Sequence, residues 1–91
     1  MFTGIIQALG KIQSKVTYDK GATLVFSSND LDFSTVVIGD SIAVNGVCLT
    51  AIEINDDGFK ADLSQETLDC SIFGGLEQGS SVNLEKALRL N

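Results

Sequence analysis

Alternation of apolar and polar residues with a period of two dominates this chain and predicts β-strands. In the run KIQSKVT, the alternation places Ile12 and Val16 together on the core face. Turn signals built on Gly, Asp and Asn separate the runs, and the chain contains no proline to interrupt a strand. The clearest runs are 11–17, 22–28, 41–44, 59–63 and 81–85.

Only residues 29–35 (NDLDFST) and 64–70 (SQETLDC) have the pattern of short helical turns. Each opens with Asn or Ser, whose side chains cap free backbone N–H groups. Short strands at regular spacing, with only one or two helical turns, predict an all-β fold. We expect a small six-stranded antiparallel barrel that closes on itself, because closure removes exposed sheet edges.

Length and charge limit the function classes. Ninety-one residues form a single domain, residues 1–91, with a thin core. The net charge of −6 and the scattered basic residues argue against a nucleic-acid surface, although the strand pattern also suits an oligonucleotide-binding barrel. No apolar run is long enough to cross a membrane.

The cysteine and histidine content argues against a metal site and against secretion. Two cysteines and no histidine provide too few ligands for zinc or iron. The N-terminus lacks the basic and long apolar regions of a signal peptide. We therefore expect reduced thiols and a cytoplasmic protein.

The segment 41–50 (SIAVNGVCLT) leaves the direction of Cys48 open. By parity with Ile42 and Val44, Cys48 points into the core, where a thiol acts as a small hydrophobe. Alternatively, Asn45-Gly46 forms a bulge that shifts the parity and turns the thiol outward. An outward thiol beside such a bend is a candidate nucleophile.

The segment 61–67 (ADLSQET) is a second candidate site. Asp62 and Ser64 lie on the polar face of a strand that runs into a turn, where a carboxylate and a hydroxyl can hydrogen-bond a polyol. The N–H groups of the turn can meet a carbonyl or an anion. The alternative is that both residues only cap the turn.

Three motifs in order connect these segments to a known family. MFTGII at 1–6, SIAVNGVCLT at 41–50 and DLSQETL at 62–68 resemble the N-terminal barrel of the riboflavin synthase family. The resemblance covers essentially the whole chain. It implies a Greek-key barrel, one of two per chain in a trimeric enzyme. The present chain then lacks the second barrel, and we expect isolated copies to pair as a homodimer.

The resemblance also implies a ligand and a reaction. Each barrel of the family binds one 6,7-dimethyl-8-ribityllumazine. One lumazine donates a four-carbon unit to another, which gives riboflavin and a pyrimidinedione, with no metal and no separate cofactor. A related alternative is a non-catalytic lumazine or flavin carrier. Such carriers tend to lose the NGxCLT pattern that this chain retains.

The residues that the resemblance assigns fall into two sets. Phe2, Ser41 and Cys48 match positions that contribute to catalysis in the family. Either Ser41 or Cys48 could be the nucleophile or the base. Asp62 and Ser64 would face the ribityl hydroxyls. The matching ligand-binding positions are Gly4, Ile5, Ile6, Cys48, Leu49, Thr50, Asp62, Leu63, Ser64, Gln65, Glu66 and Thr67.

Parity and barrel size together predict where the ligand lies. A six-stranded barrel is filled by its own side chains, so it has no room for a ring inside. Asp62 and Ser64 lie off the core parity. We therefore expect the ligand on the outer wall, half exposed until another surface covers it.

Overall fold

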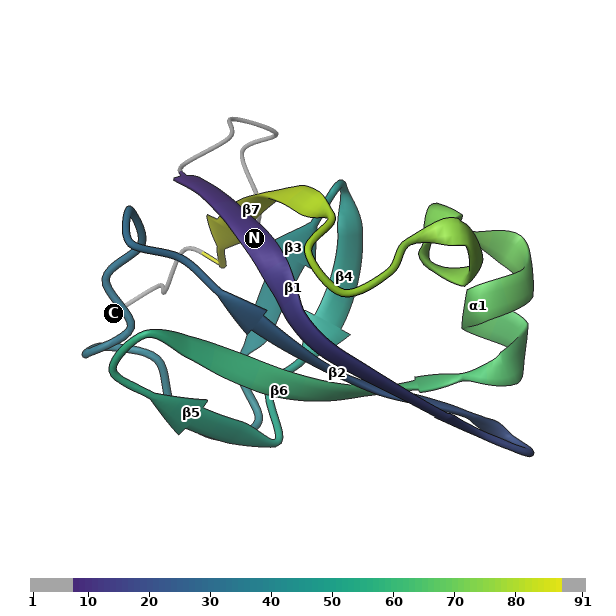
Figure 1. The fold of residues 1–91 in the computed structure, drawn as a ribbon. Coiled ribbons are helices and arrows are strands. Elements are labelled where there is room, and N and C mark those ends of the chain that lie inside the picture. The colour runs from purple at the N-terminus through teal and green to yellow at the C-terminus, as the bar shows by residue number, and fades with distance from the viewer. Residues whose placement is uncertain (1–7, 88–91) are drawn as a thin grey trace.

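The computed structural model describes residues 8–87, and residues 1–7 and 88–91 lie outside this description. Figure 1 shows strands that curl around a common interior, with α1 at one end. In chain order the elements are β1 (Ala8–Tyr18), β2 (Gly21–Ser27), β3 (Ser41–Val44), β4 (Val47–Thr50), β5 (Glu53–Asn55), β6 (Gly58–Ser64), α1 (Gln65–Cys70), the 3-10 helix η1 (Ile72–Gly75) and β7 (Ser81–Lys86).

The strands of the described residues form one antiparallel sheet in the order β4-β3-β7-β1-β2-β6-β5. This confirms the all-β class. The sheet has seven strands and not the expected six, because the short strands β4 and β5 add to the five runs that the alternation marks most clearly. The expected closure of the barrel is not seen within residues 8–87: β4 and β5 end the strand order, and no ladder joins β4 to β6.

A β-bulge in β1 changes which side chains face the core. The β1–β2 register shifts between Ile12 and Ser14, which places one extra residue on β1. Ile12 is buried as predicted, but Val16 is 61% exposed, so the prediction that both share the core face is wrong. The same shift turns Lys15 inward, and its side chain is only 7% exposed.

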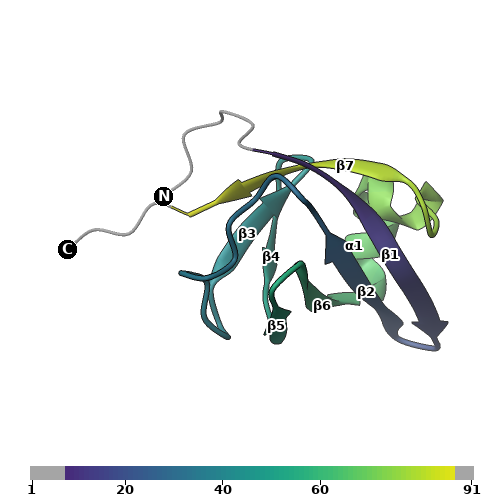
Figure 2. The same cartoon turned by 60° about the vertical axis from the view of Figure 1, so that its left-hand side comes forward.

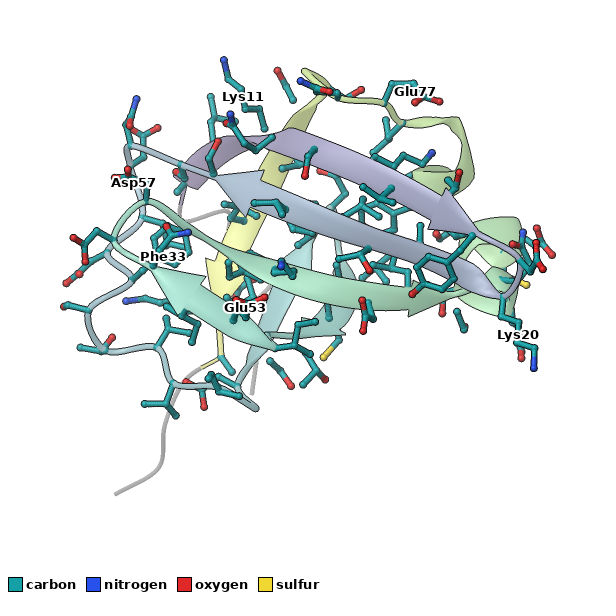
Figure 3. The ribbon with its side chains drawn as sticks, turned by 60° about the horizontal axis from the view of Figure 1, so that its bottom comes forward. Lys11, Lys20, Phe33, Glu53, Asp57 and Glu77 are labelled. Carbon is teal, nitrogen blue, oxygen red and sulfur yellow. The ribbon has the colours of Figure 1, made fainter. Side chains whose placement is uncertain are left out.

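The core is apolar and contains three stacked or edge-on phenylalanines. The Phe26 and Phe59 rings stack with centroids 5.0 Å apart, and Phe73 meets Phe26 edge-on at 6.2 Å. Phe33 reaches the same cluster from the β2–β3 connection (Figure 3). The fully buried side chains with the largest volumes are Phe26, Phe59, Phe73, Ile12, Leu24, Ile42, Leu84, Val44 and Val82.

The two predicted helical turns had different outcomes. The prediction for 64–70 is confirmed by α1, with Ser64 as its N-cap. The prediction for 29–35 is wrong, since this segment forms bends and a turn closed by the Val36 N–H on Phe33 O (3.1 Å). Hydrogen bonds from the side chain and the backbone N–H of Ser34 lower the pKa of Asp32 there. No helix in the described part of the chain is long and apolar enough to cross a membrane.

Candidate functional site

Asn45 and Gly46 join β3 to β4 by a two-residue hairpin turn. Both have positive φ, 50° for Asn45 and 82° for Gly46, which is the backbone that a type I′ turn requires. The turn is fixed to β7, because Asn45 Oδ1 accepts the Asn83 N–H (2.7 Å) and the Asn45 N–H donates to Asn83 O (2.8 Å). The Asn-Gly pair is therefore a turn and not a bulge.

This turn decides the direction of Cys48. The hairpin register pairs Ile42 with Leu49 and Ala43 with Cys48. Because paired residues share a face, Leu49 joins Ile42 in the core and Cys48 takes the opposite face. Cys48 is exposed and Leu49 is 5% exposed. The core-filler interpretation of Cys48 is therefore wrong.

Ser41 and Thr50 lie on the same outer face as Cys48. The β3–β4 register places Ser41 directly opposite Thr50, a pairing in which Cβ atoms lie about 5 Å apart. Thr50 is exposed and Ser41 is half-buried. The structure thus brings the side chains of Ser41, Cys48 and Thr50 to one face, whereas the side chain of Leu49 points into the core.

Asp62 and Ser64 project from the outer face of β6. Both are exposed, and Leu63 between them is 2% exposed, as the alternation predicted. Asp62 does not cap the following turn: its Oδ1 accepts a hydrogen bond from Thr23 Oγ1 on β2 (2.5 Å). Thr23 was missed at the sequence level, although it alternates with buried Ala22 and Leu24 and so had to face outward.

The start of α1 is organised by Ser64. Its Oγ accepts the Thr67 N–H (3.1 Å) and lies 3.1 Å from the Thr67 hydroxyl. The Gln65 N–H donates to Lys20 O (2.9 Å). The capping role predicted as the alternative for Ser64 is therefore real, and the amides of Gln65 and Thr67 are already hydrogen-bonded within the protein. Glu66 is exposed.

The polar side chains of β4 and those of β6 share one outer surface. Strand β4 contacts β6 along the open side of the sheet, and just beyond β4 the Ile52 N–H donates to Lys60 O of β6 (2.8 Å). Figure 2 shows β4 running down to β5 and β6. Leu49 and Leu63 both point into the core, so their exposed neighbours on each strand face away from it.

We call this surface the outer wall. It consists of Ser41, Cys48, Thr50, Asp62, Ser64 and Thr67. A depression of about 800 Å³ among the described residues lies away from it, between the 32–38 segment and the β5–β6 turn. Within residues 8–87, no group of three or more Cys, Asp or Glu side chains is arranged to hold a metal ion. The predicted site residues Phe2, Gly4, Ile5 and Ile6 lie outside the described residues.

Comparison with known proteins identifies the family of this chain. The profile of the lumazine binding domain family matches residues 3–87, nearly the whole chain. This chain belongs to the lumazine binding domain family. The outer wall is therefore a surface of a domain in this family.

Individual relatives agree with the family match. The chain is 47% identical to the riboflavin synthase of Photobacterium leiognathi over 88 residues, which are 97% of this chain and 40% of that protein. It is 39% identical to that of Saccharomyces cerevisiae, with the same coverage, and 41% identical to that of Bacillus amyloliquefaciens over 100% of this chain and 42% of that protein. The chain thus spans about 40% of these relatives, and the resemblance to the N-terminal domain of the riboflavin synthase family is confirmed.

Proposed function

We propose that this domain binds a ribitylated bicyclic or tricyclic ring, 6,7-dimethyl-8-ribityllumazine or riboflavin, on the outer wall. The observation that carries the proposal is that Cys48 and Thr50 on β4 face the same exposed surface as Asp62 and Ser64 on β6. A flat ring needs an open surface of this kind, because the interior is filled by core side chains.

The side chains suggest a division of roles along the wall. The Asp62 carboxylate is an acceptor for the ribityl hydroxyls, and the Ser64 and Thr67 hydroxyls can donate or accept beside it. On the β4 side, the backbone next to Thr50 supplies polar groups for the edge of the ring. Gly4, Ile5 and Ile6 complete the ring-binding set by resemblance.

We propose that the full-length protein is a riboflavin synthase, as its relatives are named. In this reaction a four-carbon unit leaves one lumazine and joins a second, so that riboflavin and a pyrimidinedione form without a metal or a separate cofactor. Cys48 and Ser41 lie on the wall where they can assist addition to the ring, with Phe2 as the third predicted catalytic residue. Two ligands must be held face to face at a fixed distance, so one wall alone supports binding far better than turnover.

The remaining proposals concern assembly. We propose that the complete domain closes as a Greek-key barrel, since β4 already contacts β6 on the open side of the sheet. A second copy can cover the ligand in place of a second barrel, which gives a homodimer of isolated domains. A cytoplasmic location agrees with Cys48 and Cys70, which are both free thiols in the structure.

Substitution of Asp62 tests the ligand assignment. Riboflavin fluorescence should be quenched saturably by the wild-type chain, and Asp62→Ala should weaken riboflavin binding by about 10-fold or more, because a hydrogen bond to a charged group is lost. The affinity for lumichrome, which has no ribityl chain, should fall much less. Asp56→Ala, an exposed carboxylate at the β5–β6 turn, is the matched control and should change neither affinity.

Three results would count against the proposal. An absence of saturable quenching by the wild-type chain contradicts ligand binding itself. Equal losses for riboflavin and lumichrome in Asp62→Ala remove the ribityl role of Asp62. A full-length protein that binds the lumazine tightly without converting it is a carrier and not a synthase.

A further inference from the structure

Thr23 and Asp62 form a cross-strand pair on the outer face of the sheet. The β2–β6 register places the two residues directly opposite each other. Thr23 Oγ1 donates to Asp62 Oδ1 at 2.5 Å, a short bond typical of a hydroxyl on a carboxylate. The partner of the Asp62 carboxylate is thus a side chain 39 positions away in sequence.

The cation nearest to Asp62 along β6 is engaged elsewhere. Lys60 shares the outer face with Asp62, two residues away on β6, and its Nζ pairs with Glu53 Oε2 at 2.5 Å. Lys60 therefore points across to β5. The orientation of the Asp62 carboxylate accordingly comes from the Thr23 hydroxyl and not from an ion pair.

A carboxylate held in this way keeps most of its acceptor capacity. An ionised carboxylate offers about four lone-pair positions, and Thr23 occupies one of them. Thr23 itself is held stiffly, because its branched Cβ restricts χ1 and its strand neighbours Ala22 and Leu24 are fully buried. The bond to Oδ1 leaves Oδ2 of Asp62 as an acceptor on the exposed side.

We propose that Thr23 is a positioning residue for the polyol chain of the ligand: it holds Asp62 in the rotamer that accepts the ribityl hydroxyls. An exposed aspartate without this bond would lose rotamer freedom on binding, and that loss weakens affinity. With the Thr23 bond, the Asp62 side chain is already restricted to one rotamer before the ligand binds. This inference rests on the proposed ribityl role of Asp62.

Three substitutions test the inference by fluorescence titration with riboflavin and with lumichrome. Thr23→Val keeps the shape of the side chain but removes the hydroxyl, and should weaken riboflavin binding by about threefold to tenfold, the effect of one ordinary hydrogen bond, with lumichrome unchanged. Thr23→Ser keeps the hydroxyl and should stay within about twofold of wild type. Thr17→Val, at an exposed threonine on β1, is the matched control and should change neither affinity.

A double-mutant cycle separates positioning from a direct contact. If Thr23 acts through Asp62, Thr23→Val should have no further effect in the Asp62→Ala background. Additive losses would overturn the positioning role. Equal losses for riboflavin and lumichrome in Thr23→Val would also overturn it, because they indicate a general effect on the sheet.

The inference and the proposed function fail in distinguishable ways. If Asp62→Ala discriminates riboflavin from lumichrome but Thr23→Val leaves riboflavin affinity unchanged, only the inference is overturned. If Asp62→Ala does not discriminate, the ribityl role itself is wrong and the inference falls with it. Urea unfolding of each variant should start from a folded baseline and show an unchanged dependence of unfolding free energy on urea concentration. This result establishes that the affinities are those of folded protein.

Discussion

Neighbouring residues on β4 face opposite sides of the sheet. The side that a residue faces determines whether its side chain can contact a ligand. Leu49 is packed in the core, whereas Cys48 is exposed on the same face as Thr50 and lies across from Ala43. A thiol in this position contributes little to packing, so the core does not account for its role. Ligand contact is the role that the outer wall offers.

Substitution of the two neighbours should separate these roles. Cys48→Ser should change the free energy of unfolding by less than about 0.5 kcal/mol, because surface changes away from special features are small. Leu49→Ala should cost about 2–5 kcal/mol, the range for deleting a buried leucine side chain. Urea unfolding of both variants measures the two losses. A large loss of unfolding free energy in Cys48→Ser would contradict the outward position of the thiol.

At the scale of elements, two local devices set the faces of the sheet. The Asn45-Gly46 turn reverses the chain and places Cys48 outside. The bulge in β1 places Lys15 inside, where its Nζ donates to Leu76 O (2.7 Å) and Phe73 O (3.2 Å). Each device changes the parity of the residues that follow it.

Gly46→Ala tests the first device. An alanine at φ 82° is strained, so we expect a loss of about 1 kcal/mol or more in unfolding free energy. The matched control is Gly75→Ala, because Gly75 has no positive φ and an added Cβ there would meet nothing within 4 Å. Equal effects of the two substitutions on thermal unfolding would contradict the special conformation of Gly46.

Lys15→Met tests the second device. The substitution removes the Nζ donor from Leu76 O and Phe73 O, of which Phe73 O still accepts the Leu76 N–H (3.3 Å). We expect a loss of about 1–3 kcal/mol in unfolding free energy. Lys20→Met, at the exposed tip of the β1–β2 hairpin (Figure 3), is the control and should be nearly neutral. A neutral Lys15→Met in urea unfolding would mean that the inward lysine does not anchor η1.

These devices also explain what the sequence could predict. Alternation correctly identified the run 59–63 as a strand and Asp62 and Ser64 as outward, because β6 has regular pairing from end to end. It failed for Val16 and Cys48, because a one-residue shift at a bulge or a turn reverses the face of every later residue. The Asn-Gly dipeptide was a recognisable hairpin signal. The Thr23–Asp62 bond required the β2–β6 register, which no local pattern carries.

At the scale of the whole molecule, the sheet presents the proposed binding surface on its outside. The described residues bury a single apolar core, and the outer wall runs over β3, β4 and β6 to the start of α1. A ring on this surface is covered on one side only. The proposed reaction brings two ligands together, so it requires a second wall to face the first.

The most direct test of the account is to map riboflavin binding on the isotopically labelled chain by amide chemical shifts. Binding on the outer wall should give saturable chemical-shift changes concentrated at residues 48–50 and 62–67. A smaller change is expected at Thr23 and none in the 32–38 segment. Changes confined to the 32–38 segment and the β5–β6 turn, or no saturable change at all, would contradict the placement of the ligand on the outer wall.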